Sequence, residues 1–161
     1  MAEYVAGLEN NLQQQIAFYR QLVELEQEKQ KALVDNVIEK IESITAQEEK
    51  ILLEVGQLEE ERLYWAEFFG KEVGKKAEDI TLTDLIQYSP GFEPIGQEFE
   101  KVISQLKNLH EINAKLLKSA LSIADFTLRL LTGQKHTTYS NPSNKGVKNE
   151  FSQNNLINKS I

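Results

Sequence analysis

Two histidines, His110 and His136, and 25 acidic residues are the side chains best suited to acid–base or metal chemistry. A carboxylate-bridged metal site in a helical bundle needs Glu three residues before His, but Lys107 stands there before His110. No second histidine lies in a helical pattern, and nothing around His136 would orient it as a general base. No serine, histidine and acid arrangement can be assembled either. The sequence therefore predicts no catalytic, metal or cofactor site, and we do not expect an enzyme.

The stretch GKEVGKK, residues 70–76, is superficially similar to a phosphate-binding loop. It has three residues between its glycines instead of four, and Lys76 stands where Ser or Thr should hold the metal ion. It also follows a helical pattern and not a strand. The carboxylates are dispersed opposite the apolar stripes, often four residues from a lysine, as on a solvated helix surface. Nucleotide binding is therefore not predicted.

Composition and charge indicate a helical protein of the cytoplasm. The chain has 161 residues, enough for one domain, no cysteine, and a formal net charge of −7. Residues 133–161 carry +3 and the rest −10, which argues against nucleic acid as a partner because phosphates need a cationic face. No basic and apolar leader is visible at the start. No apolar run approaches the roughly 20 residues of a membrane span, so membrane insertion is not expected.

Apolar spacing predicts the first two helices. The first stripe contains Val5, Leu8, Leu12, Ile16, Tyr19 and Val23. Asp35 and Asn36 favour caps and predict a hairpin turn after it, but neither Gly nor Pro enforces the turn, so one uninterrupted helix over 3–70 is the alternative.

A 4-3 heptad seam over residues 37–69 is typical of coiled-coil-like packing, which also makes pairing of two copies possible. Glu48 and Arg62 interrupt the seam about 21 Å apart, so each should find a partner on another helix or reach water. Gly70 and Gly74 are expected to end this helix.

The second half of the chain predicts a short helix and a long one. Thr81 or Thr83 can cap the short helix, and Pro90-Gly91 breaks the chain after it. From Glu93-Pro94, apolar residues repeat over a helix of about 38 residues, close to 57 Å. We therefore predict an all-α fold, an elongated antiparallel helical bundle of three long helices plus one short helix, occupying residues 1–132.

A polar segment follows the last long helix, beginning near Gly133, which stands where a C-terminal cap would. Residues 133–161 are rich in Asn and Ser, with scattered apolar residues, and cannot bury enough surface to offset their ordering entropy. We expect a flexible tail whose apolar residues anchor in a partner's groove; a merely frayed end is the alternative. The last helical turns are apolar on more than one side, and Leu121, Phe126 and Leu130 lie off the main stripe.

Five segments of the chain form an ordered set. They are Leu22-Val23-Glu24-Leu25 with Lys31-Ala32-Leu33-Val34 before Asp35-Asn36; Glu48 to Leu52 with Glu61-Arg62; Thr81 to Leu85; Asn113 to Leu117; and Thr138-Tyr139-Ser140 reaching Gly146. In their order and spacing these segments resemble the FlgN-type flagellar export chaperones. The resemblance covers roughly residues 5–146. The interval from Tyr139 to Gly146 is longer than is usual in the family, which leaves the role of Tyr139 open.

The resemblance implies a cytosolic, non-catalytic chaperone of flagellar type III secretion. Its partners would be the two hook-associated junction proteins, bound through their C-terminal helix-forming segments, and the flagellar export gate. Premature assembly of the cargo would thereby be prevented. The candidate partner-binding residues are Leu121, Phe126, Leu128, Leu130, Leu131 and Tyr139. A coiled-coil scaffold or adaptor without an export role fits the helical pattern equally well.

Overall fold

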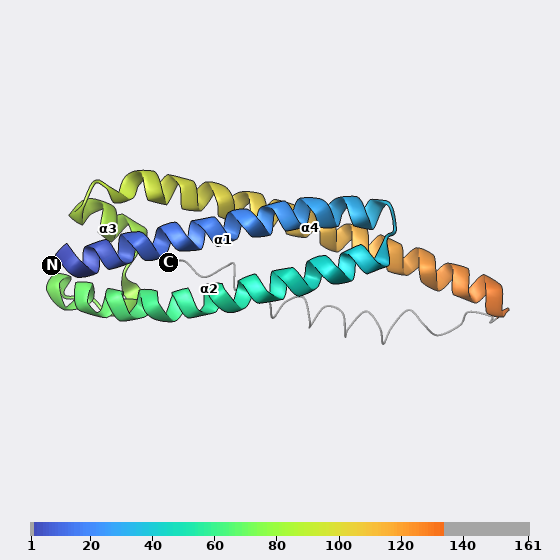
Figure 1. Ribbon diagram of the computed structural model, residues 1–161, viewed down its shortest axis with the longest axis horizontal. Helices are drawn as coiled ribbons and strands as arrows, with labels where there is room; N and C mark the ends of the chain where they lie inside the picture. The colour runs from blue at the N-terminus through green and yellow to red at the C-terminus, as the bar shows by residue number, and fades with distance from the viewer. Residues whose placement is uncertain (1, 134–161) are drawn as a thin grey trace.

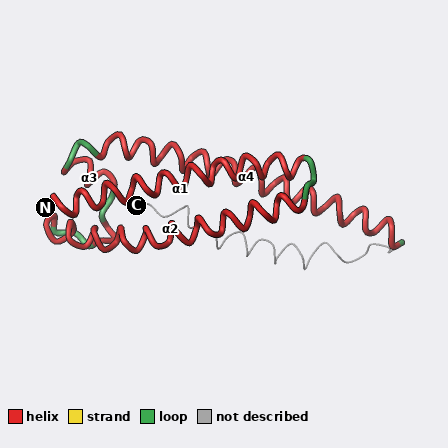
Figure 2. The backbone as a smooth tube through the Cα atoms, viewed as in Figure 1, coloured by secondary structure: helices red, strands yellow, loops and turns green. Residues whose placement is uncertain are grey.

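The computed structural model describes residues 2–133, which form an elongated arrangement of helices without strands (Figures 1 and 2). The helices are α1 (Ala2–Val34), α2 (Ile38–Val73), α3 (Leu82–Tyr88) and α4 (Phe92–Thr132), with a single 3-10 turn, η1 (Ala77–Asp79). The all-α prediction of three long helices and one short helix is confirmed. Residues 134–161 lie outside the described part, so the expected division into a bundle domain and a tail stays a prediction.

Helix α1 is central and packs against both α2 and α4 (Figure 1). Consecutive long helices run in opposite directions, so α1 and α4 are parallel to each other and antiparallel to α2. The predicted stripe of α1 is inside: Leu8, Leu12, Ile16, Tyr19 and Val23 are buried. They meet apolar side chains of α2, α3 and α4, which include Val55, Phe69, Leu85, Phe92, Phe99 and Leu106.

The predicted hairpin between the first two helices is confirmed, and the single-helix alternative is wrong. Asn36 adopts a left-handed backbone conformation with φ 56°, which Asn tolerates better than most residues. The amide of Val37 donates to the Ala32 carbonyl at 2.9 Å and closes the turn. Val37, expected as the first heptad residue, therefore lies in the turn and is exposed.

The connection between α2 and α4 is held by short-range hydrogen bonds. Thr81 is the N-cap of α3 in a reciprocal capping box with Asp84, which settles the choice between Thr81 and Thr83. Lys75 Nζ lies 2.7 Å from the same carboxylate. The Lys75 and Thr81 hydrogen bonds lower the pKa of Asp84 to about 2. Pro90 precedes α4, and Pro94 falls in its first turn, where no backbone amide is needed.

Gly74 ends α2 in a left-handed conformation, as expected, but the expectation that Gly70 also ends it is wrong. Gly70 is buried inside α2, and its carbonyl accepts from the amides of Gly74 and Lys75. A Cβ added at Gly70 would stand 2.4 Å from the Lys75 carbonyl oxygen. The backbone after α2 therefore folds back onto Gly70 at a distance that only glycine permits.

We expect Gly70→Ala to lower the free energy of unfolding by about 1–3 kcal/mol, because the loop at Lys75 must shift to accept the methyl group. Gly56→Ala is the matched control: Gly56 is exposed in the same helix, and its added Cβ meets nothing within 4 Å. Alanine there should raise stability by roughly 0.5–1 kcal/mol. Urea unfolding of both variants measures the difference, and equal stabilities would contradict this account of Gly70.

Candidate partner-binding surface

The last turns of α4 extend beyond the α1–α2 turn, so no other helix of the described chain covers them (Figure 1). Within the bundle, one face of α4 is buried through Phe99, Val102 and Leu106, and Asn113 is its last buried residue. Leu116 and Leu117 are half-buried, and from Leu121 onward the leucine, isoleucine and phenylalanine side chains are exposed. The apolar pattern that forms the core of the bundle therefore continues into solvent.

Six exposed apolar residues form what we call the α4 end. They are Leu121, Ile123, Phe126, Leu128, Leu130 and Leu131, with exposed fractions from 55% (Leu121) to 81% (Leu131). Five of these six were predicted as partner-binding from sequence, and Ile123 was not. Tyr139, the sixth predicted residue, lies outside the described residues. Exposed apolar residues gathered at one end of a polar protein make this end the candidate partner-binding surface.

Two polar side chains near the end of α4 pair within the helix. Arg129 Nη2 pairs with Asp125 Oδ2 at 2.6 Å, one turn earlier along the helix. The Thr132 hydroxyl donates to the Leu128 carbonyl at 2.8 Å, and Gly133 closes the helix in a left-handed conformation. The apolar side chains of the same turns remain exposed. Such a surface suits the apolar face of an amphipathic helix.

A buried polar network joins the three long helices at the base of the α4 end. Glu26 and Lys29 come from α1, Glu48 from α2, and His110 and Asn113 from α4. Lys29 Nζ lies 2.9 Å from Glu48 Oε2, and Asn113 Nδ2 donates to the Glu26 carbonyl at 2.8 Å and to the Glu26 carboxylate. His110 Nδ1 is 3.8 Å from Glu26 Oε1. The network fixes α4 to the hairpin just before α4 leaves the bundle.

The two polar interruptions of the heptad seam have different partners. Glu48 pairs across to Lys29 of α1, as predicted for it. For Arg62 the prediction is wrong, because the guanidinium is buried and pairs at 3.1 Å with Glu59 of its own helix. Its Nε atom has no hydrogen-bond partner within the described residues.

Burial and close neighbours shift the pKa values of Glu26 and Glu48 in opposite directions. Burial alone would raise the pKa of Glu26, but the neighbouring His110, Glu48 and Asn113 side chains lower it to about 2. Burial and the neighbouring Glu26 carboxylate raise the pKa of Glu48 to about 7. Glu48 Oε1 is buried and has no hydrogen-bond partner within the described residues. Below about pH 7, a proton on Glu48 removes the repulsion between the two carboxylates. The Glu26 carboxylate also raises the pKa of His110, against the effect of burial.

We expect the free energy of unfolding to fall as the pH rises from 5 to 8. Between pH 4.5, the ordinary pKa of Glu, and about 7, native Glu48 keeps a proton that the unfolded chain has released. His110 acts in the same direction because its native pKa is raised. Glu26, with its pKa lowered to about 2, changes the free energy of unfolding only below about pH 4.5.

In Glu48→Gln, a neutral amide replaces the titrating carboxyl and places no second charge beside Glu26, so the free energy of unfolding should fall less between pH 5 and 8 and be higher at pH 8. Urea unfolding at pH 5, 6.5 and 8 tests this. Identical pH profiles for both proteins would show that Glu48 does not hold the proton.

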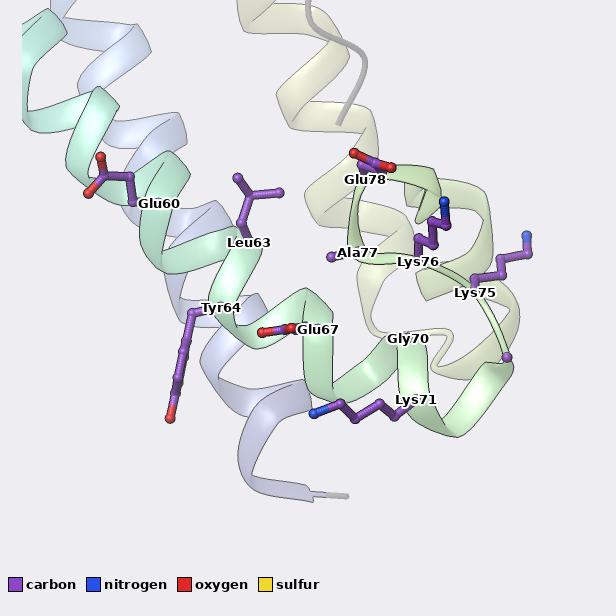
Figure 3. A pocket seen from close by; sticks show the side chains of 11 residues that line it. Glu60, Leu63, Tyr64, Glu67, Gly70, Lys71, Lys75, Lys76, Ala77 and Glu78 are labelled. Atoms are coloured by element: carbon purple, nitrogen blue, oxygen red, sulfur yellow. The ribbon is translucent and has the colours of Figure 1, made fainter.

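A hollow of about 750 Å³ beside the last turns of α2 includes most of the GKEVGKK stretch (Figure 3). Three glutamates, Glu60, Glu67 and Glu78, line it together with Lys71, Lys75 and Lys76. The three carboxylates and the three ammonium groups of this lining balance in formal charge. Within residues 2–133, no group of three or more His, Asp or Glu side chains is placed to hold a metal ion. Nor does this part contain a helix with the length and apolarity to cross a membrane.

The fold and the α4 end define an all-helical protein with an uncovered apolar helix end, a class suited to holding another polypeptide. In a comparison with protein families, residues 1–145 match the FlgN protein family. The chain therefore belongs to the FlgN family, the flagellar export chaperones. No curated protein and no solved structure matched the chain.

Proposed function

We propose that this protein is a cytoplasmic type III export chaperone for the hook-associated junction proteins of the flagellum. It binds their C-terminal helical segments, prevents premature assembly, and delivers them to the export gate. The observation that carries this proposal is the α4 end, an apolar helix surface that continues the core pattern beyond the bundle. Family membership supports the flagellar setting.

The geometry supports a simple binding mechanism. A cargo that is to pass through a narrow channel stays unfolded, and its apolar helix face needs temporary cover. The α4 end offers such cover on more than one side, including the side that packs against α1 further along α4. A cargo helix packed there buries its apolar face without ATP, and the cost of ordering the cargo keeps the affinity moderate and release possible.

Co-expression with each hook-associated protein of the same organism tests the proposal. We expect a one-to-one complex with the full chain and a weaker one with a chain that ends at Leu131. A full-length chain with residues 134–161 in scrambled order separates loss of specific contacts from loss of length. If neither junction protein forms a complex, the proposal is wrong and a helical adaptor without an export role takes its place. A complex indifferent to truncation would keep the function and confine the site to the helices.

A further inference from the structure

The outer face of α2, turned away from α1, has no partner among the described residues but exposes apolar side chains. Leu53 is 71% exposed and Tyr64 is 54% exposed, and Leu63 is exposed at the hollow beside the end of α2. In Figure 3, Leu63 lies between α2 and the loop that carries Ala77, so the hollow has an apolar floor. A helix face of this kind, apolar at several points along its length, is a docking surface for an extended segment.

Charge is distributed unevenly among the long helices. Helix α2 has ten glutamates against three lysines and one arginine, a formal charge of −6. Helix α1 has −2, and α4 has five acidic and five basic residues and is neutral. The outer face of α2 is therefore the part of the molecule that attracts a cationic segment most strongly.

The chain carries such a segment directly after α4. Residues 134–161 contain four lysines against one glutamate, a formal charge of +3, and their apolar residues include Val147, Phe151, Leu156 and Ile157. We propose that residues 134–161 dock on the outer face of α2 in the free protein, with lysines against the α2 glutamates and apolar side chains against Leu53, Leu63 and Tyr64. This inference concerns the protein without its partner and does not depend on the proposed chaperone role.

The segment is long enough to reach this face. The exposed part of α4 is about 18 Å long, and the axis of α2 from Ile38 to Trp65 spans about 40 Å. The 27 residues from Gly133 to Ser160 reach roughly 90 Å when extended, more than the roughly 60 Å required. Gly133 is in the left-handed conformation that turns the chain away from the axis of α4. Docking along α4 itself is less favourable, because α4 is neutral and carries Lys115 and Lys118 near its end.

Energy transfer from a single tryptophan to a single attached dye tests the proposal. Trp65 is the one tryptophan of the chain and lies on α2, and the chain has no cysteine, so Ser160→Cys gives a single site for an acceptor dye. An undocked segment would keep the dye within about 30 Å of Gly133, far from Trp65. A docked segment brings the dye to the end of α2. We expect clear transfer with the dye at Ser160→Cys and little with the dye at Ser140→Cys, which lies too close to Gly133 to reach Trp65.

Charge reversal on α2 then tests whether attraction between its glutamates and the lysines of residues 134–161 holds the segment in place. Glu60→Lys with Glu67→Lys places two cations on the outer face and should reduce transfer at least roughly twofold, as should raising the salt concentration to about 1 M. The matched control is Glu93→Lys with Glu100→Lys, two exposed glutamates of α4 with the same spacing. It should leave transfer unchanged. Each variant is compared with its own dye-free protein, and circular dichroism confirms that the helices remain.

Three results would overturn the proposal: no transfer with the dye at Ser160→Cys, equal loss in the two double variants, or transfer that rises with protein concentration. The last would show that the segment docks on a second copy and not on its own α2.

Discussion

Replacing both Leu130 and Leu131 by aspartate is expected to weaken binding of a hook-associated protein at least about a hundredfold. Each leucine buried in a helix interface contributes about 1.5–3 kcal/mol, and a buried carboxylate adds a desolvation cost. Both side chains are among the most exposed apolar groups of the described chain. The variant should therefore remain as helical and as stable as the wild type. Isothermal titration with the cargo segment and circular dichroism of the free variant provide the two measurements.

Val73→Asp is the control for this experiment, since Val73 is also an exposed apolar residue but lies in the last turn of α2, at the far end of the molecule from the α4 end. It should leave the cargo affinity within about threefold of the wild type, as expected for a surface change away from the interface. Unfolding of the Leu130 and Leu131 variant would show that these residues are core and that the α4 end is not a binding surface. Unchanged affinity would move the cargo site into the bundle.

Replacing Phe69 by alanine is expected to lower the free energy of unfolding by about 3–5 kcal/mol. The Phe69 side chain is fully buried and packs edge to face against Tyr88, with ring centroids 5.2 Å apart. It lies where the end of α2 meets the α3 region, so its removal leaves a cavity that the surrounding helices cannot fill. In urea, the midpoint of unfolding should fall while the m value is unchanged.

The adjacent residue provides the control. Phe68 belongs to the same helix but is 37% exposed, and it stacks on Tyr4 near the surface. Phe68→Ala should cost under about 1.5 kcal/mol, because only part of its surface leaves water on folding. Equal losses in the two variants would mean that burial does not decide the contribution of these rings.

Much of the fold could be predicted from apolar spacing and local backbone chemistry. The stripe of α1, the heptad seam of α2 and the turn at Asn36 follow from spacing and from the conformational tolerance of Asn. Details that depend on contacts between separate parts of the chain could not be predicted. Asn11 and Gln15 are polar, and nothing in the sequence indicates that both are buried. Asn11 Nδ2 donates to the Leu58 carbonyl of α2 at 2.9 Å. Gly70 looks like a helix terminator until the loop at Lys75 is seen to fold over it.

The residues of the candidate surface could be predicted from their apolar types, but the reason for their exposure could not. The apolar character of Leu121, Phe126 and Leu130 is visible in the sequence. Their exposure depends on where α4 lies along the hairpin, which is set by contacts between residues far apart in sequence, such as Asn113 with Glu26. Ile123 was not among the predicted residues, although its side chain is exposed like theirs.

The parallel course of α1 and α4 has a consequence for the order of folding. The α1–α2 hairpin closes through neighbouring segments, whereas α1 meets α4 through pairs such as Arg20 with Glu98, which are 78 residues apart. Contacts of long sequence separation carry a larger loop-closure cost and form later. During synthesis the hairpin can form before α4 has been made, so α4 completes the core last. In the folded protein, hydrogen exchange should accordingly be fastest along α4 beyond Asn113 and slowest in the middle of α1.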